Sequence, residues 1–343
     1  MSFVDQFQGD RVSRLRPAWE YHTGDVSDGS GGRRKSAFEA TPIVVDGTMY
    51  VSTPFNRVIA LDPEVGVEKW SFDPKIDLRA PYSEGLINRG VAFWTDAGTA
   101  EGEDCHRRIL LATIDARLLA LDAATGQPCA AFGAAGEVDL TRGISNITRR
   151  GEYQETSAPA IANDLVIVGS SIADNDRVRS PNGVVRAFEA RTGTLRWSWN
   201  PIANELAPTG AGNAWSTISV DAGAGLVFVP TGSASPDYHG SMRPGDNKWA
   251  NSVVALSAQT GELVWGFQLV HHDLWDYDTA AQPVLGTLRR NGVGMPVVIQ
   301  GNKTGNLFVL DRRTGKPVFG VEERSVPKSD ADDETAGGPP HTA

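Results

Sequence analysis

The sequence has few cysteines and no long apolar run, and each shortage excludes a class of protein. Two cysteines in 343 residues, Cys105 and Cys129, cannot form the four-ligand zinc site of a structural zinc finger. No CxxCH motif is present, so this chain carries no covalently attached haem. No apolar run approaches the ~18 residues of a transmembrane helix, and the N-terminal residues lack the apolar core of a signal peptide.

Basic charge is also scarce. The chain has 32 Lys and Arg against 42 Asp and Glu, a formal net charge of −10, and its longest basic run is Arg33-Arg34-Lys35. Surfaces that bind nucleic acid or anionic lipid need clustered Lys and Arg. We therefore expect neither a nucleic-acid partner nor binding to an anionic membrane surface.

Glycine, proline and tryptophan are plentiful by contrast, and they occur in a repeated frame. The 37 Gly, 20 Pro and nine Trp favour many short strands and turns over a helical bundle. Each repeat begins with a small or apolar residue, has glycine at its seventh position and usually ends with an aromatic residue. The five repeats are ALDPEVGVEKW (60–70), ALDAATGQPCA (120–130), AFEARTGTLRW (187–197), ALSAQTGELVW (255–265) and VLDRRTGKPVF (309–319).

The physical properties of one repeat indicate an all-β fold. An apolar strand enters a turn whose glycine supplies the left-handed residue of a hairpin, and a second strand leads to the aromatic residue. Another alternating strand lies upstream of each repeat, and tight turns are expected at 45–48 and 162–165. Such a small sheet cannot bury its own faces, which favours radial stacking of sheets as the blades of a β-propeller. An ordinary β-sandwich with coincidental hairpins is the alternative.

Motifs beyond the repeat resemble one enzyme family. The frame AxDxxTGxxxW resembles the tryptophan-docking motif of the pyrroloquinoline quinone (PQQ) dehydrogenases, or quinoproteins. HHDLWDYD (271–278) is the more specific match, and RPGDNKW (243–249) and KTGN (303–306) support it in the same order. The ADN at 173–175 and the positions of both cysteines are most similar to the membrane-bound glucose/quinate/shikimate dehydrogenase type.

The resemblance implies how the chain is organised. The family folds as an eight-bladed β-propeller of four-stranded antiparallel blades, whereas five repeats are visible here. We expect residues 1–326 to form a partial PQQ-dehydrogenase-type propeller, an incomplete ring without the C-terminal blades. We expect residues 327–343, which are of low complexity, to form a disordered tail.

The resemblance also implies an activity, the PQQ-dependent oxidation of an alcohol, polyol or aldose. Hydride would pass from the alcohol carbon to PQQ, and the electrons would then pass to ubiquinone or cytochrome c. Asp276 is expected to be the general base that takes the hydroxyl proton. Lys303 is expected to stabilise the negative charge that develops on the quinone oxygen.

The other implied site residues bind the cofactor and a cation. Ca²⁺ would polarise the quinone, with Mg²⁺ or a lanthanide as alternatives. The expected cofactor-binding residues are Glu39, Arg89, Thr156, Ser171, Trp215 and Lys303. The expected metal ligands are Asp174, Asn175, Ser233 and Asp276. Methanol enzymes carry asparagine at the position of Ser233, so Ser235 or a backbone carbonyl is the alternative ligand there.

Each of these residues taken singly has a simpler explanation. Asp276 could cap backbone amides in a turn, and Asp174 could belong to a solvated loop. Trp215 could pack within a blade, and Arg89 and Lys303 could be ordinary surface charges. Their joint occurrence in the order of the family favours the functional interpretation.

The resemblance further implies a Cys105–Cys129 disulfide and a periplasmic location, although the sequence shows neither an export signal nor a membrane anchor. Two alternatives to an active enzyme stay open. One is a cofactor-free propeller scaffold of the outer-membrane assembly type, and the other is an inactive, truncated fragment of the enzyme. A scaffold has no physical reason to keep the WDY, NRG and KTGN motifs together.

Overall fold

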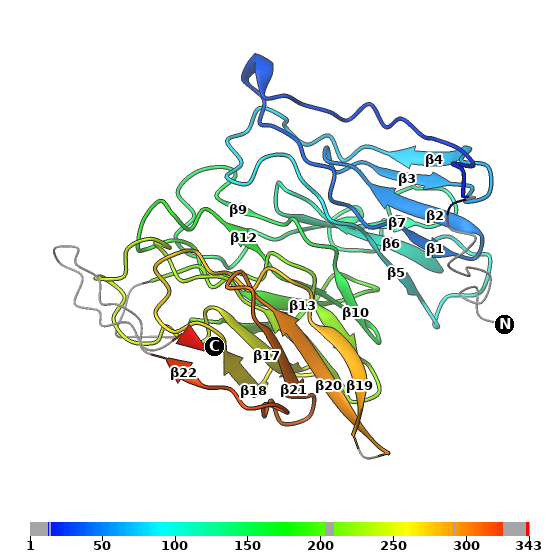
Figure 1. Cartoon of the computed structure of the whole chain (residues 1–343). Helices are drawn as coiled ribbons and strands as arrows, with labels where there is room; N and C mark the ends of the chain where they lie inside the picture. The colour runs from blue at the N-terminus through cyan, green and yellow to red at the C-terminus, as the bar shows by residue number, and fades with distance from the viewer. Residues whose placement is uncertain (1–12, 14, 203–208, 291, 325–340, 343) are drawn as a thin grey trace.

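Nearly all of the regular structure is antiparallel β-sheet. The computed structural model describes residues 13, 15–202, 209–290, 292–324 and 341–342 (Figure 1). The first sheet contains β1 (Ile43–Val45), β2 (Thr48–Ser52), β3 (Val58–Leu61) and β4 (Glu68–Phe72), and the second contains β5 (Ala92–Thr95), β6 (Arg107–Ala112), β7 (Arg117–Asp122) and β8 (Glu137–Asp139). One short 3-10 helix, η3 (Ser30–Gly32), precedes the first sheet.

Three further sheets follow. The third contains β10 (Ala160–Ala162), β11 (Leu165–Val168), β13 (Val185–Glu189) and β14 (Leu195–Trp199), and the fourth contains β15 (Ser219–Asp221), β16 (Leu226–Pro230), β17 (Ser252–Ser257) and β18 (Leu263–Gln268). The fifth contains β19 (Val284–Arg290), β20 (Val293–Gly301) and β21 (Leu307–Asp311). Two-stranded pairs join β9 (Tyr153–Gln154) to β12 (Ser171–Ile172) and β22 (Glu323–Arg324) to β23 (His341–Thr342).

Each large sheet is a meander in which the strands pair in chain order. The turns expected at 45–48 and 162–165 connect β1 to β2 and β10 to β11, which confirms both predictions. The fifth sheet differs from the expected four-stranded form, because three strands make up its ladder. After β21 the described residues continue the pairing only by an isolated bridge between Leu310 and Pro317 and a hydrogen bond of 2.8 Å from the Val318 amide to the Val309 carbonyl.

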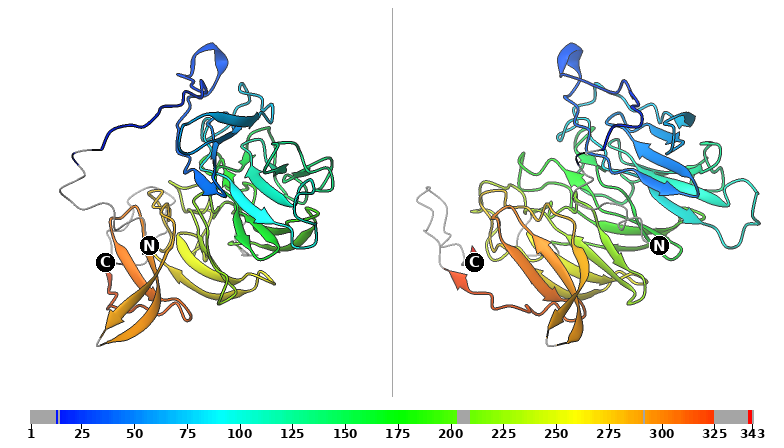
Figure 2. Two further views of the ribbon diagram at one scale, coloured as in Figure 1. Left: turned by 90° about the vertical axis from the view of Figure 1, so that its right-hand side faces the viewer. Right: turned by 45° about the vertical axis from the view of Figure 1, so that its right-hand side comes forward.

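The five sheets are arranged side by side around a common centre, as Figure 2 shows. The first strands of neighbouring sheets lie next to one another, since β5 contacts β10, β10 contacts β15 and β15 contacts β19. The predicted all-β propeller of antiparallel sheets is therefore confirmed, and the alternative of a β-sandwich is excluded.

The apolar core lies between neighbouring sheets. One cluster joins Val58 of the first sheet to Ile109 and Leu121 of the second, and all three side chains are fully or almost fully buried. A corresponding cluster joins Ile167 of the third sheet to Val227 of the fourth. Because each sheet buries its faces only against its neighbours, removing one sheet would expose two apolar surfaces.

The repeated aromatic residue and the repeated glycine meet across the boundary between sheets. Trp197, at the end of the third repeat, lies over the glycine turn of the fourth, where a Cβ added to Gly261 would come within 2.5 Å of the indole. The indole Nε1 of Trp197 also donates a hydrogen bond of 2.9 Å to the Ala258 carbonyl in that turn. The same contact recurs for Trp19 on Gly66, Trp70 on Gly126 and Trp265 on Gly315.

The boundary between the second and third sheets lacks this tryptophan. The second repeat ends in Ala130, and Val138 of β8 occupies the place next to Gly193. The predicted disulfide is present in the same sheet and joins Cys105 to Cys129 with a Cα–Cα distance of 5.8 Å. The disulfide links the segment before β6 to the segment after β7.

The boundary predicted at residue 326 lies outside the described residues and stays a prediction. The tail at 327–343 lies outside the described residues, apart from His341 and Thr342. No helix in the described ranges has the length and apolar character that crossing a membrane requires.

The docking contact predicts a stability difference between two glycine variants. Gly261 has a φ of 73° and no room for a Cβ, whereas Gly225, in the β15–β16 turn, has a φ of 65° and nothing within 4 Å of an added Cβ. Gly225→Ala should lower the free energy of unfolding by about 1–2 kcal/mol, the cost of the left-handed backbone alone. Gly261→Ala should cost roughly twice as much, because the methyl group also displaces the indole of Trp197.

Differential scanning calorimetry of the two variants measures this difference. Equal losses of stability would show that the contact between tryptophan and glycine is not tight, and the account of blade docking would then be wrong.

Candidate active site

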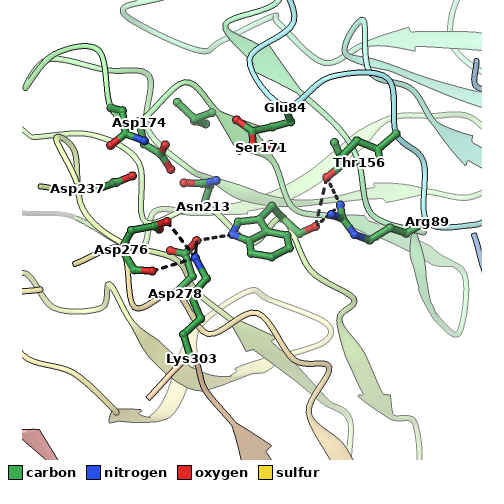
Figure 3. Close-up of a pocket in the computed structure, with 14 residues that line it drawn as sticks. Glu84, Arg89, Thr156, Ser171, Asp174, Asn213, Asp237, Asp276, Asp278 and Lys303 are labelled. Carbon is green, nitrogen blue, oxygen red and sulfur yellow. Dashed lines mark hydrogen bonds and ion pairs between the residues drawn. The ribbon is translucent and has the colours of Figure 1, made fainter. Parts of the chain in front are cut away.

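A pocket of about 260 Å³ lies where the loops that connect the strands of all five sheets converge (Figure 3). Its residues come mainly from connections between strands, while Ser171 and Ile172 form the short strand β12. The lining residues are Glu84, Ile87, Arg89, Thr156, Ser171, Ile172, Asp174, Asn175, Asn213, Trp215, Asp237, Asp276, Asp278 and Lys303. Residues more than 200 positions apart in the chain therefore share one site.

A cationic wall is built around Arg89, which precedes β5. Its guanidinium carbon lies 4.9 Å from the centroid of the Trp215 ring, in cation–π contact. Nη1 donates to Thr156 Oγ1 at 2.6 Å and to the Trp215 carbonyl at 3.3 Å. Nη2 forms an ion pair of 2.9 Å with Glu39, which does not itself line the pocket. These contacts hold the guanidinium and the indole in one arrangement.

A second cation, Lys303 from the β20–β21 loop, lies between two carboxylates. Its ammonium donates to Asp276 Oδ2 at 3.1 Å and to Asp278 Oδ2 at 3.2 Å. The Trp215 indole nitrogen donates to the same Asp278 oxygen at 3.0 Å, and the Ser233 amide donates to the other oxygen at 2.6 Å. Asp278 therefore positions both the ammonium and the indole, and both of its oxygens already have donors.

Asp276 is the carboxylate of this group that is best suited to accept a proton. Burial, and next the negative charge of Asp278, raise its pKa to about 6, and Lys303 opposes this shift. A half-buried carboxylate with a pKa nearer to neutral is a stronger base than an exposed aspartate. The flanking rings of Trp275 and Tyr277 stack on each other with centroids 6.2 Å apart.

An acidic wall faces the cationic one. Figure 3 shows Asp174 and Asp237 on one side of the pocket and Arg89 on the other. Burial raises the pKa of Asp237 to about 8, with further contributions from the charges of Asp278 and Asp276. Burial, followed by the charge of Asp237, raises the pKa of Asp174 well above its usual range. Two neighbouring carboxylates in this position need protons or a cation to offset their charge.

The pocket brings together most of the residues that the sequence singles out. Eight line it directly, namely Arg89, Thr156, Ser171, Asp174, Asn175, Trp215, Asp276 and Lys303. Glu39 reaches it only through Arg89. Ser233 lies behind the wall and is fully buried, and its hydroxyl donates to Asp273 at 2.7 Å. Ser235 is also fully buried, and its hydroxyl bonds to backbone carbonyls, including that of Asp174.

Six lining residues were not among the site residues predicted from the sequence, namely Glu84, Ile87, Ile172, Asn213, Asp237 and Asp278. Asp237 occurs in SASPDYHG, where an aspartate after proline is typical of a turn, so its residue type carried no distinct signal. Asn213 lies two residues before Trp215, and this closeness to a predicted cofactor-binding residue was the one sequence signal that could have placed it in the pocket. Both side chains are 1 % exposed.

Comparison with known proteins shows a single family. The profile of the PQQ-dependent "glucose/ethanol/alcohol dehydrogenase, beta-propeller domain" family matches residues 2–338. The chain is 38 % identical to the glycerol dehydrogenase large subunit of Gluconobacter oxydans (strain 621H), over 94 % of this chain and 45 % of that protein. It is also 38 % identical to the quinoprotein glucose dehydrogenase of Escherichia coli (strain K12), over 96 % of this chain and 43 % of that protein.

Solved structures agree with this result. The crystal structure of the quinohemoprotein alcohol dehydrogenase from Comamonas testosteroni superposes with a TM-score of 0.70 at 30 % sequence identity, covering 90 % of this chain and 46 % of that one. The resemblance inferred from the motifs is thus confirmed. The chain spans less than half the length of the curated relatives it matches.

A buried carboxyl group lies directly beside the pocket residue Thr156. Glu155 is fully buried, and neither of its carboxylate oxygens has a hydrogen-bond partner. Burial raises its pKa to about 8, and the nearby charge of Arg186 opposes this shift only in part. The group is therefore protonated in the folded protein near neutral pH and ionised in the unfolded chain.

Glu155 should make the stability of the protein depend on pH. A carboxyl with a raised folded-state pKa stabilises the fold at low pH, and this contribution is lost as the pH rises from the usual glutamate range toward 8. Between pH 5.5 and 8 the wild type should lose about 2–3 kcal/mol through this group, a loss that Glu155→Gln should not show.

Thermal unfolding at several pH values measures this effect. Glu64→Gln, a change at an exposed turn residue, serves as the control and should keep the pH dependence of the wild type. Parallel curves for the wild type and Glu155→Gln would mean that Glu155 ionises freely in the folded protein, which contradicts its buried, unpaired position.

Proposed function

Because the chain belongs to the β-propeller family of PQQ-dependent glucose, ethanol and alcohol dehydrogenases, we propose that it binds PQQ in this pocket and oxidises an alcohol, polyol or aldose. One observation carries the proposal: Lys303 bridges Asp276 to Asp278, and Asp278 holds the indole of Trp215. A base, a cation and a flat apolar surface thus form one connected unit.

The residues present fit a flat, anionic cofactor. The Trp215 ring offers an apolar surface for a planar group, and Arg89 and Lys303 offer positive charge on two sides of that ring. Thr156 and Ser171 add hydroxyl groups within the same pocket. When bound, PQQ supplies the electrophilic ortho-quinone that accepts hydride from the alcohol carbon.

The chain itself would supply the proton acceptor and the orientation. Asp276 would take the hydroxyl proton of the substrate, since its carboxylate faces the pocket and is partly desolvated. Lys303 would present its ammonium where negative charge develops during the reaction. Asp278 would act as a positioning residue, because its oxygens are already engaged by Ser233, Trp215 and Lys303.

A divalent cation would offset the excess of acidic side chains in the pocket. Five acidic side chains line the pocket and only two basic ones, so a tricarboxylate would meet a net negative site. Ca²⁺ suits the oxygen atoms that Asp174, Asn175 and Asp276 offer, and Mg²⁺ or a lanthanide are the alternatives. The cation would offset the net negative charge of the pocket and would polarise the quinone.

The same proposal includes the substrate class, the electron acceptor and the cellular location of the protein. The matched relatives are named for glycerol and glucose, which supports a polyol or sugar as the substrate class here. Ubiquinone or cytochrome c would receive the electrons. The Cys105–Cys129 disulfide is consistent with the oxidising periplasm.

The base assignment predicts the effect of Asp276→Asn. The amide keeps the shape of the side chain but cannot take a proton, so dye-linked oxidation should fall by roughly 10²–10⁴-fold. The assay uses purified protein with PQQ and Ca²⁺ and tests glucose, glycerol, quinate and ethanol. Asp104→Asn, at an exposed position outside the pocket, should keep the wild-type rate.

The result separates the possible outcomes. Equal rates for Asp276→Asn and the wild type would contradict the assignment of Asp276. If the wild type turns over none of the four substrates, PQQ titration distinguishes a chain that binds the cofactor without turnover from one that forms no cofactor site.

A further inference from the structure

Two buried oxygen atoms in the pocket wall have no partner. Asp237 Oδ1 and Asn213 Oδ1 lie in side chains that are 1 % exposed, and neither atom receives a hydrogen bond. Both residues line the pocket beside Asp174, as Figure 3 shows. A buried acceptor without a donor costs free energy, so such atoms mark a place where a ligand would complete the wall.

Ser233 is poorly placed to meet a ligand in this pocket. Its hydroxyl donates to Asp273 at 2.7 Å and accepts from Asn251 Nδ2 at 2.9 Å. Its amide donates to Asp278, and the residue is absent from the pocket lining. The hydroxyl and the amide of Ser233 are therefore both already engaged by other side chains of the protein.

The β16–β17 loop instead presents Asp237, four residues further along the chain. Ser235, midway between the two positions, donates its hydroxyl to the Asp174 carbonyl at 2.6 Å. The contact ties the loop of Asp237 to the loop of Asp174, so the two carboxylates are neighbours. In the described ranges, neither Asp174 nor Asp237 forms an ion pair with a basic side chain. Lys303, the lysine that lines the pocket, pairs with Asp276 and Asp278 instead.

From this geometry we infer that Asp237, rather than Ser233, is a further carboxylate ligand of the divalent cation, with Asn213 Oδ1 as a neutral oxygen ligand. The inference rests on the proposed function, which is the reason to expect a cation in this pocket. A hard cation such as Ca²⁺ takes carboxylate and amide oxygens together, and the two unpartnered atoms are of these two kinds.

The protein alone offers an incomplete coordination shell. No group of three acidic, histidine or cysteine side chains in the part of the chain that the structure describes is arranged as a preformed metal site. Asp174, Asp276 and Asp237 would be acidic ligands and Asn175 and Asn213 amide ligands, so Ca²⁺ with its six to eight oxygens would still need further ligands. Oxygens of the bound cofactor or water would provide them, and Ca²⁺ should bind more tightly when PQQ is present.

The test compares the affinity of four proteins for Ca²⁺ itself. Isothermal titration calorimetry with CaCl₂, with and without PQQ, is run on the full chain as wild type, Asp237→Asn, Ser233→Ala and Asp176→Asn. Asp176 forms an exposed ion pair with Arg149 and does not line the pocket, so Asp176→Asn removes the same charge close by without touching a ligand. Melting temperatures with and without Ca²⁺ provide a second readout.

We expect Asp237→Asn to weaken Ca²⁺ binding by about tenfold or more and to lose the rise in melting temperature that Ca²⁺ causes. Ser233→Ala and Asp176→Asn should stay within about twofold of the wild type. Without Ca²⁺, Asp237→Asn should melt no lower than the wild type, because it removes a buried acidic group whose Oδ1 has no hydrogen-bond donor. If it fails to fold, Asp237→Glu, which keeps the carboxylate, should bind Ca²⁺ more tightly than Asp237→Ala.

Three results would overturn the inference: wild-type Ca²⁺ affinity in Asp237→Asn, a loss of affinity in Ser233→Ala alone, or no Ca²⁺ binding by the wild type. PQQ titration of the same samples separates this failure from failure of the proposed function. If the wild type binds PQQ and Asp237→Asn binds Ca²⁺ as tightly as the wild type does, only the assignment of Asp237 as a ligand is refuted. If the wild type does not bind PQQ, the proposed function is refuted.

Discussion

The structure depends on the fact that no single sheet of this chain can bury both of its faces. Each sheet therefore packs against the next, and the tryptophan at the end of one repeat docks on the glycine turn of the following one. The contact tolerates no Cβ, which sets the spacing between sheets and hence where their connecting loops lie. The loops meet at one place, and the pocket is the consequence.

Charge is the second constraint, and it acts within the pocket. Asp276 and Asp278 are offset by Lys303, whereas Asp174 and Asp237 have no basic partner among the described residues. Burial and the charge of Asp278 raise the pKa of Asp276. An anionic cofactor would add to the imbalance of charge in the pocket, which a cation would offset. The proposed catalytic base and the proposed metal site would thus both arise from one excess of carboxylates.

The sequence predicted those features that depend on local chemistry. The five glycine turns and the hairpins at 45–48 and 162–165 follow from residue type and spacing, and the docking of the tryptophans was implied by the resemblance to the family. The disulfide and the main pocket residues came from the family motifs. The number of strands in the fifth sheet was overestimated, since three strands form it rather than four. Ser233 and Asp237 show the limit: position along a loop does not reveal which side chain points into a pocket, and only the fold decides this.

The most direct test of the account is equilibrium binding of PQQ to the purified chain, with Ca²⁺ and with a chelator, for the wild type and Trp215→Ala. The account predicts one PQQ per chain in the presence of Ca²⁺, much weaker binding when the cation is removed, and weaker binding without the indole on which Arg89 stacks. Absence of binding, or binding that depends on neither Ca²⁺ nor Trp215, would contradict it.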